Sequence, residues 1–267
     1  MNELGFDVTE ALDWFPVGAT TPYCLIRVPE ATAARWAHAL GIALRRCYVT
    51  DAVLEERAEA LGLPKSEVLA SKLPDPGSVM SGDFGEVVAY FYHAASQHER
   101  VAFGPKKWRL KEARTKPAPY SDVVQIVVPM WPEASEHDLI ICSEVKAKAT
   151  AGDFSPISAA ITGCAKDRLS RLAKTLAWLK DRAIGENLGC IDLAHLNRFI
   201  NATDYPPATK RFCAIAVISS GLVDAEIAKD APQEEPADYS IIILSVPELH
   251  AVYTGAYEAA RQSADEI

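Results

Sequence analysis

The sequence lacks the features that would place the chain in a membrane or on a secretory route. Its longest apolar runs fall well short of the roughly 20 residues that a membrane-spanning helix needs. The N-terminus, Met1 to Asp7, is acidic and has no basic segment followed by an apolar one, as a secretory signal would have. We therefore expect a cytoplasmic protein without a membrane partner.

Metal-binding cysteines and a nucleotide-binding loop are missing as well. None of the six cysteines forms a C-x-x-C pair or joins a histidine at zinc spacing. Cys24, Cys142 and Cys213 lie in apolar runs, where a free thiol acts as a small hydrophobic side chain. There is no G-x-x-x-x-G-K-[ST] loop, so we do not expect the chain to hydrolyse ATP by itself.

Basic residues are scarce relative to acidic ones. The chain carries 27 Lys and Arg against 36 Asp and Glu, which gives a formal net charge of −9. A protein that binds nucleic acid unaided usually shows a basic footprint. The composition therefore argues against strong independent binding to DNA. It leaves open a local basic channel, or a partner that delivers the substrate.

Apolar runs and chain breakers predict an α/β fold in two parts. The stretch Leu73–Ser78, which contains two prolines and a glycine, is the best internal boundary. It separates a small, α-rich N-terminal extension, residues 1–75, from a larger domain, residues 76–267. The extension is predicted to hold a strand at 21–28 and helices at 30–46, 51–62 and 64–73. The domain is predicted to hold a helix at 82–97, strands near 108–114, 121–128 and 138–147, a helix at 155–184 and a strand at 211–218. A helix or loop follows at 222–238, where the acidic, turn-rich composition favours a solvated loop. A strand at 239–244 and a terminal helix capped at Ser245 complete the domain.

Four charged residues lie near the starts or ends of these predicted elements: Glu86, Asp122, Glu144 and Lys146. Because side chains alternate across a strand, Glu144 and Lys146 project to the same face at the end of a buried strand. Burying charge is costly unless the charge is paired or holds a metal. Each residue alone is better explained as an ion-pair member, a strand-start cap or a first-turn helix acid. The four together predict a metal-dependent nuclease.

The element order and these residues resemble a known nuclease core. Helix, three strands, helix and strand is the order of the PD-(D/E)xK fold, a central mixed sheet flanked by helices. Asp122 and the run Glu144-Val145-Lys146 carry the resemblance, although Ser121 stands where the motif's name has proline. In that superfamily the two acids bind Mg²⁺, and a glutamate on the preceding helix, here Glu86, often joins them.

A closer resemblance is to the HamA family, the nuclease subunits of Hachiman anti-phage defence systems. It rests on Gly85-Glu86, the basic stretch 106–111, the run 121–124 and the run 140–146, and it covers about residues 80–260. The resemblance implies a DNA endonuclease that depends on Mg²⁺ (or Mn²⁺). It also implies a superfamily 2 helicase partner, HamB, for which residues 1–75 are a candidate docking surface.

Phosphodiester hydrolysis sets the role of each candidate residue. Because Mg²⁺ prefers oxygen ligands and keeps several waters, two or three carboxylates suffice to hold it. We assign Asp122 and Glu144 as metal ligands, and Glu86 as a further ligand, directly or through water. The family pattern adds the Val145 carbonyl oxygen as a ligand. Lys146 is expected to orient or deprotonate the attacking water and to steady the developing charge.

Basic residues next to the predicted site are candidates for phosphate contact. Those assigned to DNA binding are Lys106, Lys107, Arg109, Lys111 and Lys148. The first four flank the predicted first core strand and would form a phosphate-tracking rim, on which Trp108 could stack a base. The alternative is a solvated hairpin with Trp108 in the core. Basic residues on the long helix, Arg171 among them, are typical of an ordinary polar helix face, although Lys166 and Lys174 could face DNA from one side.

Two other classes of function fit the same sequence. A non-catalytic adaptor would keep the nuclease fold and only bind a partner protein, without a divalent-metal site at Asp122 and Glu144. A stand-alone restriction endonuclease would read DNA sequence itself and give discrete fragments without a helicase. Metal binding and the pattern of cleavage products separate these alternatives from a helicase-coupled nuclease.

Overall fold

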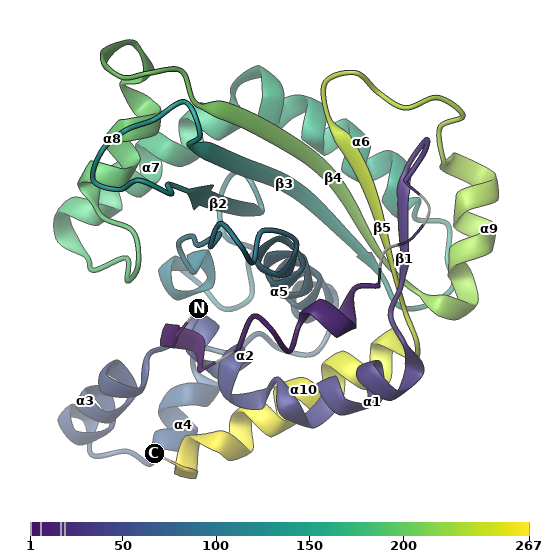
Figure 1. Ribbon diagram of the computed structural model, residues 1–267. Helices are drawn as coiled ribbons and strands as arrows, with labels where there is room; N and C mark the ends of the chain where they lie inside the picture. The colour runs from purple at the N-terminus through teal and green to yellow at the C-terminus, as the bar shows by residue number, and fades with distance from the viewer. Residues whose placement is uncertain (1, 6, 17, 19, 267) are drawn as a thin grey trace.

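One five-stranded mixed sheet organises the protein (Figure 1). The computed structural model describes residues 2–5, 7–16, 18 and 20–266, and its strands follow the order β1-β5-β4-β3-β2. The strands are β1 Cys24–Arg27, β2 Val123–Val127, β3 Leu139–Lys148, β4 Thr209–Ser219 and β5 Ser240–Val246. Strands β1, β5, β4 and β3 run parallel, and β2 is antiparallel to β3. The predicted α/β class, with a central mixed sheet between helices, is confirmed.

Helices cover both faces of the sheet (Figure 1). The helices on the face of α5 are α1 Glu30–Ala39, α2 Gly41–Tyr48, α3 Asp51–Leu61, α4 Lys65–Ala70, α5 Ser78–Ser96 and α10 Leu249–Gln262. The helices on the other face are α6 Pro156–Lys166, α7 Leu172–Gly185, α8 Leu193–Ile200 and α9 Ser220–Asp230. The short helical turns are η1 Asn2–Leu4, η2 Leu12–Trp14, η3 Lys107–Leu110, η4 Asp167–Arg171, η5 Ala202–Asp204 and η6 Ser263–Glu266.

The strands are nearly continuous apolar runs because both of their faces are covered. Along β3, Ile141 and Val145 pack into the large core around α5, whereas Ile140 and Cys142 pack against the opposite helices. This alternation sends Glu144 and Lys146 to the face of α6 near the carboxyl end of β3. A buried strand with helices on both sides therefore fixes where the charged residues emerge.

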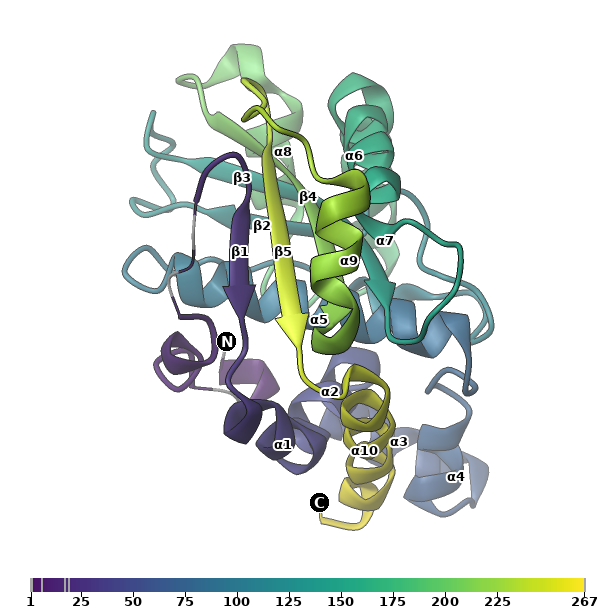
Figure 2. The ribbon, with the colours of Figure 1, turned by 90° about the vertical axis from the view of Figure 1, so that its right-hand side faces the viewer.

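The N-terminal 75 residues share the core of the remaining chain. Strand β1 pairs with β5, with Cys24 opposite Ile242, and Figure 2 shows these two strands side by side. Helices α1 and α2 pack on α10, and Trp36 is 1% exposed within the large core. The stretch 73–78 is therefore not a break between separate cores. Docking of a partner on this region stays a prediction.

The segment 108–114 is not the first core strand that the pattern predicts. It begins inside η3, a 3-10 helix, and the bridge to β2 comes instead from Phe103, which pairs with Ile126. Lys107 and Trp108 are neighbours in sequence and are both buried, at 1% and 3% exposure. A half-exposed strand would send one of them to solvent.

Two further element predictions need correction. The predicted acidic loop 222–238 is helical in its first half, where Val223 and Glu226 of α9 are buried. Ser245 does not cap the terminal helix, because it belongs to β5 and its Oγ lies 2.9 Å from Ser220 Oγ. The residue before α10 is Glu248, in a left-handed conformation. Turn-rich composition and a capping-box pattern were both outweighed by packing against the sheet.

The long helix after β3 is present and begins as the sequence indicates, with Ser155 before Pro156 in the first turn. Its middle is a π-helical turn, η4, which joins α6 to α7. In the described part of the chain, no helix combines the length and the apolar composition that crossing a membrane requires.

Candidate functional site

The four predicted catalytic residues line one cavity of about 750 Å³ near the carboxyl end of β3. Glu86 reaches it from α5, Asp122 from the residue before β2, and Glu144 and Lys146 from β3. The charged residues that line this cavity are Asp83, Glu86, Asp122, Glu144, Lys146 and Arg171. Side chains far apart in sequence are therefore gathered at one opening beside the sheet.

The ammonium of Lys146 lies among three oxygen atoms of the predicted metal site. Its Nζ is 2.6 Å from Glu144 Oε1, 3.0 Å from the Val145 carbonyl oxygen and 3.5 Å from Asp122 Oδ2. The same Asp122 oxygen accepts a hydrogen bond from the Val145 N–H at 2.8 Å. Oxygens from three predicted ligands thus converge on one position, where a positive charge now stands.

Glu144 is held on both of its carboxylate oxygens. Lys146 contacts Oε1, and Arg171 pairs with Oε2. Burial, and next the negative charge of Asp122, raise the pKa of Glu144, while the two cations act in the opposite direction. Burial lowers the pKa of Lys146, but Asp122 and Glu144 outweigh it and leave that pKa above its ordinary value. Lys146 is therefore a charged donor in this arrangement.

The backbone of α6 makes room for Glu144 at Gly163. A Cβ atom at this position would lie 2.3 Å from Glu144 Oε1 and 2.5 Å from its Cγ. Contacts this short do not occur between real Cβ atoms and their neighbours, so any larger residue would displace the carboxylate. Helix α6 approaches the functional strand this closely because residue 163 has no side chain.

Glu86 lies deeper in the same cavity and is held by Trp108. The indole Nε1 of Trp108 donates to Glu86 Oε2 at 2.9 Å, and Glu86 is only 6% exposed. Burial, together with the charges of Asp122 and Asp83, raises the pKa of Glu86 well above its ordinary value. Since a divalent cation nearby would favour the charged carboxylate, this accumulation of acids suits a cation site.

The donor set fits a hydrated magnesium ion. Within the described residues, no three His, Cys, Asp or Glu side chains lie close enough together to hold one ion. Asp122 and Glu144 supply two carboxylates, and the Val145 carbonyl oxygen adds a third donor at the point where Lys146 Nζ stands. Mg²⁺ binds through one or two carboxylates and keeps several waters, so this set suffices when Lys146 moves aside.

Ser121 has a structural reason to replace the proline of the motif's name. Its backbone N–H donates to Thr175 Oγ1 at 3.1 Å, and its hydroxyl donates to Asp167 Oδ1 at 2.7 Å. Proline could make neither bond, because it lacks an N–H and a hydroxyl. Ser121 therefore ties the start of β2, and with it Asp122, to the long helix.

The predicted phosphate-tracking rim is not formed, because its lysines are buried, two in ion pairs and one on a backbone carbonyl oxygen. Lys106 Nζ is 2.6 Å from Glu3 Oε1, and Lys111 Nζ is 2.7 Å from Asp83 Oδ2. Lys107 is 1% exposed and donates to the Ser121 carbonyl oxygen. These ammonium groups are used inside the protein and do not face solvent.

The other two predicted DNA contacts are also engaged internally. Arg109 Nε donates to the Arg46 carbonyl oxygen at 2.9 Å. Lys148 Nζ lies 2.6 Å from Glu226 Oε1 and donates to the carbonyl oxygens of Gly152 and Phe154, each at 2.7 Å. Lys148 thus anchors the loop after β3. The sequence does not reveal these roles, because the Arg46 carbonyl oxygen and Glu226 lie far away in the chain from Arg109 and Lys148.

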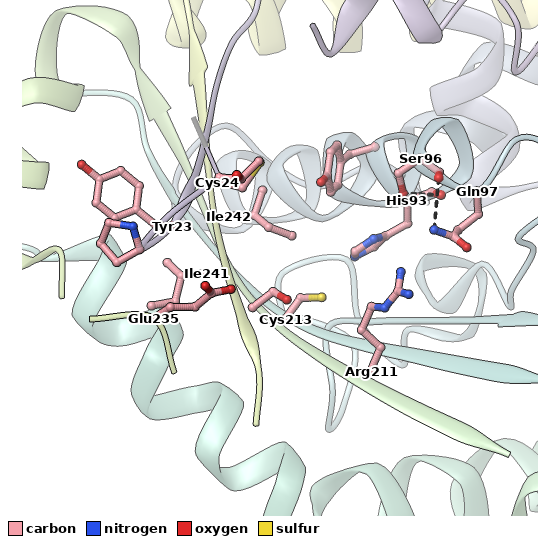
Figure 3. Close-up of a pocket in the computed structure, with 14 residues that line it drawn as sticks. Tyr23, Cys24, His93, Ser96, Gln97, Arg211, Cys213, Glu235, Ile241 and Ile242 are labelled. Atoms are coloured by element: carbon pink, nitrogen blue, oxygen red, sulfur yellow. Dashed lines mark hydrogen bonds between the residues drawn. The ribbon is translucent and has the colours of Figure 1, made fainter. Parts of the chain in front are cut away.

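A second cavity, of about 270 Å³, lies at the amino ends of β1, β4 and β5 (Figure 3). It contains one carboxylate, Glu235, which Figure 3 shows toward the end away from Arg211 and His93. Cys24 and Cys213 also line it. Burial raises the pKa of both thiols, so neither is an activated nucleophile. The paired carboxylates that the sequence predicts are in the larger cavity.

We expect His93, in the wall of the second cavity, to make the fold sensitive to acid. Burial, and then the charge of Arg211, lower the pKa of His93 to about 3. Below about pH 6.5 the unfolded chain binds a proton that the folded protein does not, so stability falls as pH drops, by at most about 1.4 kcal/mol per pH unit. Denaturant unfolding between about pH 7 and pH 5 should show a steeper loss for the parent than for His93→Gln. Equal losses would contradict this account.

The fold and the cavity define an α/β protein with a central mixed sheet flanked by helices, which is consistent with a nuclease-like core. Two acids and a lysine meet near the carboxyl end of β3. The chain belongs to the HamA family, whose model matches residues 11–260. It is therefore a component of Hachiman anti-phage defence. No curated protein matches the chain. The family match begins at residue 11, so the relationship also includes most of the region that the motifs left out.

Proposed function

We propose that this chain is a Mg²⁺-dependent DNA endonuclease that acts as the effector of its defence system. One observation supports the proposal most strongly: oxygens of Asp122, Glu144 and Val145 converge on a single cation position inside an open cavity. A structural ion pair would need only one acid for Lys146. Two acids, a carbonyl oxygen and an opening of about 750 Å³ suit a cation and a phosphodiester instead.

The residues have distinct roles in the proposed reaction. Bound Mg²⁺ would shield the phosphate charge and make a water molecule more acidic. Asp122 and Glu144 would hold the ion, and Glu86 would contribute from the rear wall through a water. Lys146, within hydrogen-bond reach of both acids, would donate to the attacking water or to a phosphate oxygen and stabilise the charge that develops there.

A helicase partner, HamB, is part of the proposal. The net charge of −9 and the burial of Lys106 and Lys107 argue against strong capture of DNA by the chain alone. Delivery of DNA by a translocating partner would supply what this surface lacks. It would also keep the nuclease from binding the host genome freely.

The test uses the purified chain with supercoiled plasmid, alone and with the helicase subunit plus ATP. We expect nicking that requires Mg²⁺ or Mn²⁺, stops with EDTA and increases with the helicase. Calorimetry with Mn²⁺ should show binding to the chain without DNA. Absence of both metal binding and cleavage would favour an adaptor. Discrete fragments from a defined DNA without the helicase would favour a restriction endonuclease.

A further inference from the structure

The π-helical turn η4 places Arg171 beside the candidate site. The Leu172 N–H donates to the carbonyl oxygen of Asp167, five residues earlier, as in a π helix. Such turns insert one extra residue into a helix and are frequent at functional sites. Asp167 is 1% exposed, and Arg171 reaches Glu144 on β3. The turn therefore directs toward the sheet a pair that the sequence pattern assigns to a polar helix face.

The guanidinium of Arg171 has two contacts at a terminal nitrogen and a separate anchor at Nε. A terminal nitrogen pairs with Glu144 Oε2 and donates to the Gly163 carbonyl oxygen at 2.9 Å. Its Nε donates to Asp167 Oδ1 at 2.6 Å, and the Ser121 hydroxyl holds that same carboxylate oxygen at 2.7 Å. Because the anchor does not involve Glu144, it persists when Glu144 binds something else.

The excess of acidic over basic residues in the cavity indicates a role for Arg171. Among the described residues that line it, Lys146 and Arg171 are the two basic ones. The acidic ones are Asp83, Glu86, Asp122 and Glu144. A phosphate entering this cavity meets excess negative charge and needs every cation within reach. The planar guanidinium, with several donors in a fixed fork, matches phosphate oxygens better than an ammonium does.

We propose that Arg171 is a phosphate-binding catalytic residue that is stored on Glu144 until a divalent cation takes up that carboxylate. This inference rests on the proposed nuclease function. In the structure each Glu144 oxygen holds one cation, Lys146 at Oε1 and Arg171 at Oε2. A metal ligated at Oε1 draws on the negative charge of the same carboxylate, and it therefore weakens the hold of Oε2 on Arg171. The released terminal nitrogen, still tethered through Nε to Asp167, then remains at the cavity where the phosphate enters.

If Arg171 is stored on Glu144, Arg171→Met should change Mn²⁺ affinity and cleavage rate in opposite directions. Mn²⁺ binding to the chain without DNA, measured by calorimetry, should become at least about threefold tighter, because a competing cation is gone. Single-turnover cleavage of plasmid at saturating metal should fall at least about tenfold, because a charged donor to the phosphate is lost. Arg171→Lys keeps a charge but not the fork, so its cleavage rate should lie between those of Arg171→Met and the parent. If Arg171 only supported the fold, Arg171→Met would lower both the Mn²⁺ affinity and the cleavage rate.

Arg168→Met is the matched control, since Arg168 lies on the same π turn, pairs with Asp238 and does not line this cavity. It should leave metal affinity and cleavage unchanged. Parent-like cleavage by Arg171→Met would overturn the inference alone. Weaker Mn²⁺ binding by a folded Arg171→Met protein would also overturn it. If Arg171→Met does not fold, weaker Mn²⁺ binding by Arg171→Lys would overturn it instead. A parent protein that neither binds Mn²⁺ nor cleaves would refute the proposed function and the inference with it.

Discussion

Cleavage is expected to fall at least about a thousandfold when Glu144→Ala and Lys146→Ala are combined. The double change removes a carboxylate from the cation position and the charged donor beside it. The fold should survive, because Asp122 keeps its hydrogen bond from the Val145 N–H and Arg171 keeps Asp167. No buried charge is left without a partner, which is the main way such changes unfold proteins. Plasmid nicking with Mg²⁺ and the helicase partner measures the loss.

A second acid–base pair provides the matched control for this double change. Glu258 and Arg261 lie on exposed parts of α10, with 3.4 Å between Arg261 Nη1 and Glu258 Oε2. Exposed pairs of this kind contribute roughly 0–1 kcal/mol to stability. Changing both to alanine should leave cleavage and folding as in the parent. If Glu144→Ala with Lys146→Ala nicks at the parent rate while folded, the catalytic assignment is wrong.

The sequence predicts the site's position because strand geometry is strict. Alternation along a buried strand places Glu144 and Lys146 on one face, whatever surrounds them. The antiparallel pairing of β2 with β3 puts Val123 opposite Ser143, so Asp122 arrives next to Glu144. The first relation needs only local periodicity, which the apolar run reveals, whereas the second comes from a strand pairing that the structure supplies.

The surroundings of the site depend on contacts that local patterns do not encode. Glu3, near the N-terminus, neutralises Lys106, and Asp83, 28 positions earlier in the chain, neutralises Lys111. A run of basic residues therefore looks exposed in sequence and is buried in the fold. Arg171 is a similar case, because Asp167 four residues earlier suggests an ordinary surface pair on a regular helix. Only the π turn, which has no clear sequence signal, brings the pair inward.

Gly163→Ala is expected to reduce cleavage about a hundredfold, although it lies on a helix and adds only a methyl group. The new Cβ would stand 2.3 Å from Glu144 Oε1 and 2.4 Å from its Cδ, so the carboxylate must leave its present position. Its contacts with Lys146 and Arg171 would be lost with it. Mn²⁺ affinity should weaken as well, by about tenfold, because a displaced ligand no longer completes the site.

The global stability of Gly163→Ala should change little, which separates this effect from unfolding. The obstructing atoms belong to a side chain and not to the backbone, so the clash can be relieved by rotation of Glu144. Alanine also favours a helix interior by about 1 kcal/mol over glycine, which offsets the lost ion pairs. Gly221→Ala on α9 is the control, because a Cβ there meets nothing within 4 Å. If Gly163→Ala binds Mn²⁺ and cleaves like the parent, Glu144 does not act from the position that the structure gives it.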